Sequence, residues 1–219
     1  MNRLWLACLA TLLAAAPPQD FDKSKHPWTK WKEGSYAKLK MSTEMGEMKQ
    51  EGSITYTLTK LTDKDFTVST AVEAAGNTHD DAETEEFPTK AGEETLTVDG
   101  KKFECVIWKS KGTRGGSESE TKVWVPKGKD FALKITTTGG QEVSFTAVKL
   151  GEKVKVMEKE FDCVRLEGTI GQGGSDMKAT IWTHPSIPGG MMKGEMKLKA
   201  GEQEGTITLE LVEMKAEKK

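Results

Sequence analysis

The sequence is short of the residues from which most catalytic and metal sites are built. Of 219 residues, only three are cysteine and three are histidine. His26, His79 and His184 lie far apart and lack the spacing of metal ligands or of a catalytic triad. The sequence therefore predicts no catalytic, cofactor-binding or metal-binding residues. Basic residues are not in excess either, with 32 Lys and Arg against 34 Asp and Glu. That balance argues against nucleic acid as a partner, because phosphate binding needs clustered positive charge.

Long hydrophobic runs are also scarce, and the clearest one stands at the N-terminus. Arg3 precedes an apolar stretch from Leu4 to Ala16 that ends in consecutive alanines. The stretch is shorter than the roughly 20 residues that cross a bilayer, and its pattern is typical of a cleavable signal peptide over residues 1–16. We therefore expect an exported protein, periplasmic or extracellular, without a transmembrane segment. Residues 17–26, which begin with Pro17-Pro18, are expected to form a linker.

What the sequence does contain is alternation with a period of two. Apolar residues alternate with Thr over residues 54–59 and again over 206–211. Such alternation predicts strands with one buried and one wet face, and the 22 glycines supply turns between them. Asp99-Gly100 is a strong hairpin signal, and the doubly apolar segments 103–108 and 161–166 predict central strands. The predicted fold class is all-β: an antiparallel meander forming a curved sheet or a flattened barrel.

An internal repeat organises much of the chain. A shift of 58 positions aligns Phe103-Glu104-Cys105-Val106 with Phe161-Asp162-Cys163-Val164, and Val123-Trp124 with Ile181-Trp182. This match indicates a tandem duplication. We therefore expect an N-terminal β-meander over 27–88, β-repeat units over 89–150 and 151–214, and a charged tail over 215–219. The acidic residues 79–86 are expected to form a loop or a charged edge strand.

The cysteines admit two interpretations. Signal-peptide cleavage removes Cys8 and leaves Cys105 and Cys163, at equivalent positions of the two units. An even pair in an oxidising compartment suggests a disulfide, which would be worth about 4 kcal/mol on the chain-entropy model. Alternatively, each is a small apolar residue in its own strand, because duplication alone produces two cysteines that need not meet.

The tryptophans are the candidate ligand-facing residues. Trp108 lies in a predicted central strand, whereas Trp124 and Trp182 are equivalent in the repeat. Exposed on a sheet, such side chains could stack on a sugar or line a lipid groove. Core packing is the alternative for Trp124 and Trp182.

Several segments together resemble a known group of proteins: residues 31–36, 61–64, 98–105, 181–182 and 187–190. Their pattern resembles uncharacterised exported β-proteins of planctomycete-type bacteria, and the resemblance covers most of the chain after residue 26. More distantly, the pattern is similar in architecture to LolA-like periplasmic lipoprotein carriers. The resemblance implies an exported, curled antiparallel sheet, while architecture alone does not imply a function.

Three functional hypotheses follow from these observations. The first is a non-enzymatic cell-envelope or secreted protein that binds a partner or an apolar ligand, with a lipid, a glycan or an envelope protein as the candidate partner. The second is an enzyme acting on envelope polysaccharide, or a carbohydrate-binding module. The third is a purely structural or interaction protein. An open apolar cavity would favour ligand binding, whereas the enzyme requires two carboxylates converging within about 5–10 Å.

Overall fold

The structure is a computed structural model and describes residues 21–114, 116–139, 142–172, 175–200 and 203–218. The expected signal peptide and the first part of the expected linker lie outside these residues. The described chain is almost entirely antiparallel β-structure, and the predicted all-β class is confirmed. It contains no helix of the length and apolar character that crossing a bilayer requires.

The elements follow one another as hairpins. One short 3-10 helix, η1 (Lys23–Lys25), comes before the strands. The strands are β1 (Tyr36–Met45), β2 (Met48–Leu61), β3 (Asp65–Ala74), β4 (Asn77–Glu86), β5 (Thr89–Val98), β6 (Lys101–Arg114), β7 (Ser117–Pro126), β8 (Lys134–Thr138), β9 (Val143–Val156), β10 (Lys159–Gln172), β11 (Ser175–Thr183), β12 (Met191–Ala200) and β13 (Gln203–Lys215).

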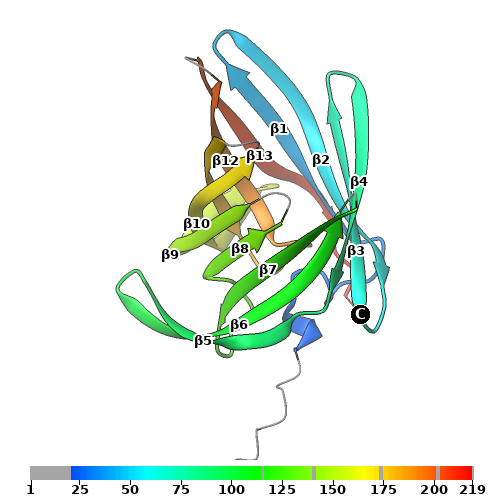
Figure 1. Ribbon diagram of the computed structural model, residues 1–219. Helices are drawn as coiled ribbons and strands as arrows, with labels where there is room; N and C mark the ends of the chain where they lie inside the picture. Colours follow the sequence, from blue (N-terminus) through cyan, green and yellow to red (C-terminus); the bar gives the residue numbers. More distant parts are fainter. Residues whose placement is uncertain (1–20, 115, 140–141, 173–174, 201–202, 219) are drawn as a thin grey trace, which may run out of the picture.

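The sheet closes on itself. Its strand order is β4-β3-β2-β1-β13-β12-β11-β10-β9-β8-β7-β6-β5, and β4 also pairs with β6. This extra pairing, called the closure seam below, joins Glu83–Glu85 to Gly112–Arg114. All strands except β5 therefore form a closed antiparallel barrel (Figure 1). The predicted curved sheet or flattened barrel is confirmed, and the sheet is closed into a barrel.

Strands β4 and β5 share one edge of β6. The first part of β6 pairs with β5 from Lys101 to Lys109, and its last part pairs with β4 at the closure seam. The connection between β4 and β5 is Phe87-Pro88, where the proline withholds a backbone N–H from the ladder. The chain thus leaves the barrel wall at this point, and β5 runs outside it.

The hairpins follow local turn chemistry. Asp99 and Gly100, with φ of 50° and 71°, form the two-residue connection between β5 and β6. Positive φ at both central residues is the type I′ geometry that suits the twist of an antiparallel pair. The predicted hairpin is confirmed, and β6 and β10, which contain the doubly apolar segments, each have strands on both sides.

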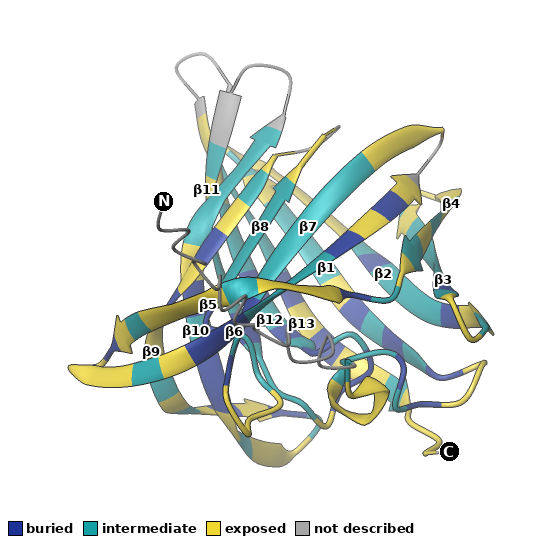
Figure 2. Cartoon of the chain, turned by 60° about the horizontal axis from the view of Figure 1, so that its bottom comes forward, coloured by how far each residue is buried: buried dark blue, intermediate teal, exposed yellow. Residues whose placement is uncertain are grey.

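Buried residues form three clusters. The largest includes Cys105, Trp124 and Leu166, and the second includes Cys163, Trp182 and Met192. The third contains Trp31, Leu58 and Phe66, and so attaches the N-terminal residues to β2 and β3. Figure 2 shows buried and exposed residues alternating along the strands, as their sequence periodicity predicts.

The expected repeat units occupy one continuous sheet. Strand β9 spans the boundary between residues 150 and 151, so no linker separates the units. Equivalent residues make matching contacts. Trp124 Nε1 donates to Glu94 at 2.6 Å, and Trp182 Nε1 donates to Glu152 at 2.8 Å. Lys134 and Lys193 lie over the respective rings at 4.5 and 4.9 Å. These contacts support the proposal that the units arose by duplication.

Candidate functional site

Residues 21–31, called the N-terminal segment below, cover one end of the barrel. Asp22 caps η1 by accepting a hydrogen bond from the Ser24 amide at 3.0 Å. Trp31 is 3% exposed, and its Nε1 donates to the Pro27 carbonyl at 2.9 Å. The Lys32 amide donates to the Glu217 carbonyl at 2.7 Å. Part of the expected linker and of the expected charged tail is therefore held against the barrel.

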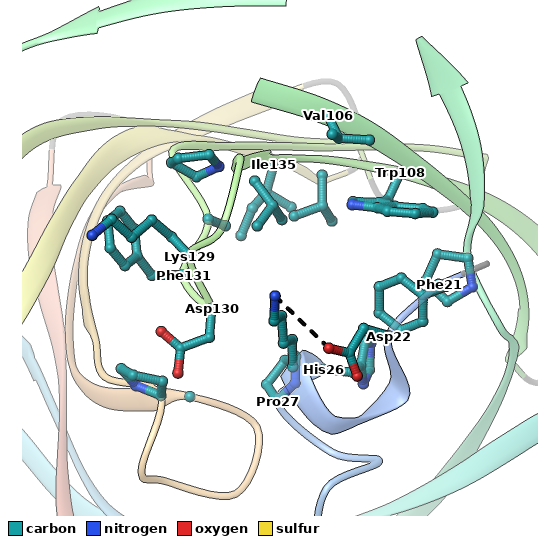
Figure 3. A pocket seen from close by; sticks show the side chains of 18 of the residues that line it. Phe21, Asp22, His26, Pro27, Val106, Trp108, Lys129, Asp130, Phe131 and Ile135 are labelled. Carbon is teal, nitrogen blue, oxygen red and sulfur yellow. Dashed lines mark ion pairs between the residues drawn. The ribbon is translucent and has the colours of Figure 1, made fainter. Parts of the chain in front are cut away.

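A cavity of about 390 Å³ lies between this segment and the strands (Figure 3). Its wall is mainly apolar because β6, β7 and β8 turn alternate side chains toward it. The apolar lining residues of these strands are Val106, Trp108, Val123, Val125 and Ile135. Phe21 from the N-terminal segment and Phe131 from the loop between β7 and β8 complete the apolar lining. The cavity falls within the roughly 300–1,000 Å³ typical of small-molecule sites.

One carboxyl group faces this cavity from the closure seam. Glu85 on β4 lines the cavity and accepts a short hydrogen bond from the hydroxyl of Ser110 on β6. Ser110 is itself 5% exposed. The pKa of Glu85 is raised to about 7, mainly by burial and in part by the charge on Glu83, although the Ser110 hydrogen bond acts in the opposite direction. Glu85 is thus a carboxyl that changes charge near neutral pH.

Charged groups gather on the side of the cavity away from the apolar wall. Asp22 and Lys25 form an ion pair of 3.7 Å, drawn as the dashed line in Figure 3. Asp130 and Lys129 come from the loop between β7 and β8. Both residues of the Asp22–Lys25 pair are about half exposed, so their attraction is screened and contributes little to stability. The cavity therefore has an apolar wall and a solvated, charged margin.

His26 is held neutral at the base of the N-terminal segment. Its ring lies between those of Phe21, at 5.7 Å, and Phe66, at 4.9 Å. Nδ1 accepts the Trp28 amide at 3.2 Å. Burial, with a smaller contribution from nearby Lys30, lowers the pKa of His26 to about 3. His26 therefore acts as an aromatic packing group at neutral pH.

The three candidate ligand-facing tryptophans lie in different places. Trp108 lines the cavity, with its ring 5.0 Å from that of Phe21 in an edge-to-face arrangement. Val123 pairs with Trp108 and also lines the cavity, so Trp124, the next residue of β7, points to the opposite face of the sheet. Trp124 and Trp182 are 7% and 9% exposed and belong to two different core clusters.

Cys105 and Cys163 are free and buried in the structure. They belong to different core clusters and to β6 and β10, which β7, β8 and β9 separate in the sheet. Neighbouring strands lie about 4.8 Å apart, whereas a disulfide needs Cα atoms within about 7 Å. This arrangement does not support the disulfide interpretation and agrees with the alternative, in which each cysteine is a small apolar residue in its own strand. Burial raises the pKa of both thiols, that of Cys163 to about 11, so neither is activated as a nucleophile.

The described residues hold no group of three or more His, Cys, Asp or Glu side chains arranged to bind a metal ion. The cavity residues that sequence reasoning missed are Phe21, His26, Glu85 and Ser110. Phe21 and His26 fell within the expected linker, and Glu85 within an acidic stretch expected at the surface. Asp81, Glu83 and Glu85 are less exposed than their neighbours on β4, an alternation that the acidic sequence does not show.

Comparison with known proteins yields only distant structural likenesses. The chain matches no protein-family model and no curated protein. A Bacteroides fragilis protein with a YmcC-like fold shares 10% identity at a TM-score of 0.41, over 84% of this chain and 96% of that one. A DUF1329 family protein from Desulfovibrio piger shares 11% at 0.33, over 84% and 86%. The MucA/MucB complex of Pseudomonas aeruginosa gives 9% at 0.18, over 84% and 94%.

These scores, all below 0.5, carry no inference about function. They leave the resemblance to planctomycete-type proteins unsupported.

Proposed function

We propose that this protein is an exported, non-enzymatic binding protein that holds an apolar small molecule in the cavity under the N-terminal segment. The observation that carries the proposal is the cavity itself. Trp108 and four aliphatic side chains of β6, β7 and β8 line it, and no described side chain fills it. Burying an apolar ligand against such a wall is favourable by roughly 25 cal/mol per Å² of area removed from water. A fully packed interior would have favoured a purely structural role.

A small apolar ligand suits this site better than a glycan. Sugars are usually bound by planar polar side chains and by aromatic rings exposed on a face. Here the aromatic rings of Trp108 and Phe21 pack edge to face, and the other lining residues of β6, β7 and β8 are mostly aliphatic. Trp124 and Trp182, the other candidates for stacking, are buried.

A cavity-filling substitution tests the proposal. Val123 is half-buried, lines the cavity and lies opposite Trp108 in the ladder, so Val123→Trp should fill the space. Purified protein is titrated with N-phenyl-1-naphthylamine, an apolar dye whose emission rises in an apolar site. We expect saturable binding by the wild type and at least about tenfold weaker binding by Val123→Trp, since the dye would lose most of its buried area.

The matched control is Val212→Trp. Val212 is 47% exposed on β13 and does not line the cavity, so this variant adds the same side chain elsewhere. Its dye affinity should equal that of the wild type. Absence of saturable dye binding by the wild type, or equal loss in both variants, would contradict a ligand role for the cavity.

A further inference from the structure

Glu85 places an acidic group in the wall of the cavity. Its side chain lines the cavity beside Trp108 and receives a hydrogen bond from neutral Ser110. None of the three lysines that line the cavity forms an ion pair with it, and the charge of Glu83 on the same strand raises its pKa. Two of the lysines that line the cavity are engaged elsewhere. Lys25 pairs with Asp22 at 3.7 Å, and Lys127 pairs with Glu93 at 2.8 Å.

Aromatic rings line the same cavity as this carboxyl group. Trp108 lies two residues before Ser110 on β6, so both side chains project from the same face of the strand into the cavity. The Phe21 ring lies 5.0 Å from that of Trp108. An indole face attracts a cation through its quadrupole, and the attraction strengthens where water is excluded. A carboxylate beside a tryptophan ring is thus suited to an ammonium group, while the aliphatic wall is suited to a hydrocarbon chain.

We propose that the ligand of this cavity is an apolar molecule bearing an amine, with Glu85 as the residue that binds the ammonium group and Trp108 as its aromatic neighbour. The proposal deepens the binding function above and rests on it. Binding leaves the amine protonated and the carboxyl ionised, so the ion pair forms with no covalent step. The apolar chain would then lie along the wall formed by Val106, Val123 and Ile135.

Other titratable and charged groups surround Glu85, and their charges also act on a ligand whose binding is measured against pH. Phe66 of β3 and Gly112 of β6 pair with Glu85 and are uncharged. The charged or titratable groups nearby are Glu83 on β4, Asp22, Lys25 and His26 in the N-terminal segment, Lys127, Lys129 and Asp130 before β8, and His184 after β11. Burial lowers the pKa of His26 to about 3, below the pH range of the test, and burial also lowers the pKa of His184.

The test uses three ligands that share one chain: decylamine, 1-decanol and decanoate. Each displaces N-phenyl-1-naphthylamine from the full-length protein at pH 6 and pH 8. We expect decylamine to bind the wild type at least about tenfold more tightly than 1-decanol at pH 8, since a charge-assisted hydrogen bond is lost in the alcohol. Decylamine affinity should rise about tenfold from pH 6 to pH 8, because the ionised fraction of a group of pKa about 7 rises by that factor.

Glu85→Gln keeps the shape of the side chain and the acceptor for Ser110 but removes the charge. It should bind decylamine and 1-decanol equally and show no dependence on pH. The matched control is Glu86→Gln, which removes the same charge from the adjacent, exposed residue of β4 and should behave as the wild type. Should Glu85→Gln fail to fold, the ratio of decylamine to 1-decanol affinities in the wild type at the two pH values still decides.

Two contrary outcomes distinguish a failure of the amine proposal from a failure of the proposed binding function. Equal affinity of the wild type for all three ligands, or tightest binding of decanoate, would overturn the amine proposal and leave an apolar binding cavity. Failure of all three ligands to displace the dye would instead count against ligand binding in the cavity altogether.

Discussion

At the scale of single residues, two titratable groups with opposite effects flank the cavity. Glu85 has a folded pKa of about 7, above its ordinary value of 4.5, so it binds more protons in the folded state and stability falls as pH rises through that interval. His26 has a folded pKa of about 3, below its ordinary 6.5, so the unfolded state binds more protons and stability falls as pH drops through that interval. The two slopes oppose each other between about pH 4.5 and 6.5.

The contribution of His26 can be isolated by substitution. His26→Asn keeps an oxygen that can accept the Trp28 amide but cannot titrate in this range. Between pH 7 and pH 4 the wild type should lose on the order of 3 kcal/mol of stability through protonation of His26 in the unfolded state, and the variant should not show this loss. Urea unfolding at both pH values measures the difference. Parallel curves for the two proteins would mean that His26 can be protonated in the folded state.

At the scale of elements, the N-terminal segment is fixed by contacts that sequence periodicity does not show. Gly189, in the loop between β11 and β12, has φ of 74° and lies under the Trp28 indole. A Cβ atom at Gly189 would stand 2.6 Å from Cζ2 of Trp28, closer than real contacts allow. The Gly189 amide also donates to the Pro27 carbonyl at 3.2 Å. This loop therefore positions the segment that covers the cavity.

Gly189→Ala should displace Trp28 and loosen the segment. Gly190→Ala is the matched control, because Gly190 also has a left-handed φ, of 82°, yet its Cβ would meet Pro27 only at 3.8 Å. Both variants incur backbone strain of about 1 kcal/mol, and Gly189→Ala should lose about 1–2 kcal/mol more through the clash. Urea unfolding gives the difference, and hydrogen exchange over residues 21–31 should increase in Gly189→Ala alone. Equal behaviour of the two variants would show that Trp28 moves aside without consequence.

At the scale of the whole molecule, the barrel joins the beginning of the chain to its end. β1 pairs with β13 along its whole length, and the closure seam joins β4 to β6. Without β1–β4, the two expected repeat units would have an unpaired edge at β13 and a partly unpaired edge at β6. Strands β1–β4 fill the gap in the barrel between these two edges. We expect folding to be cooperative over the entire barrel, because an open edge of this length exposes unpaired backbone groups.

A fragment of residues 89–214 tests this expectation. It contains both repeat units but lacks β1–β4, and it should not form a monomer that unfolds in a sharp thermal transition. A fragment of residues 21–219 keeps every strand and should unfold as the full-length protein does. Circular dichroism melting and size-exclusion chromatography measure both. A monomeric, cooperatively melting 89–214 fragment would indicate that the repeat units fold by themselves.

The alternation of apolar residues and threonine determined the strands, and turn chemistry at Asp99-Gly100 determined a hairpin, because both depend on neighbours in the sequence. The direction of Trp108 relative to Trp124 follows from the same periodicity, once one strand face is known to be the inner one. Local periodicity does not, however, reveal which face becomes the inside of a closed sheet.

Closure and the site it creates were decided only by tertiary structure. The pairing of Glu85 with Gly112 joins residues of different hairpins, and no local pattern distinguishes that carboxyl from the exposed Glu86 beside it. The packing of Phe21 and His26 over the barrel end depends in the same way on contacts with Trp108 and Phe66, far along the chain. The sequence by itself determined the β-strands, and it predicts a signal peptide and a repeat. Closure of the barrel places part of the acidic stretch and part of the expected linker in the wall of a cavity. This placement could not be predicted locally, because the burial of a residue depends on which distant parts of the chain pack around it.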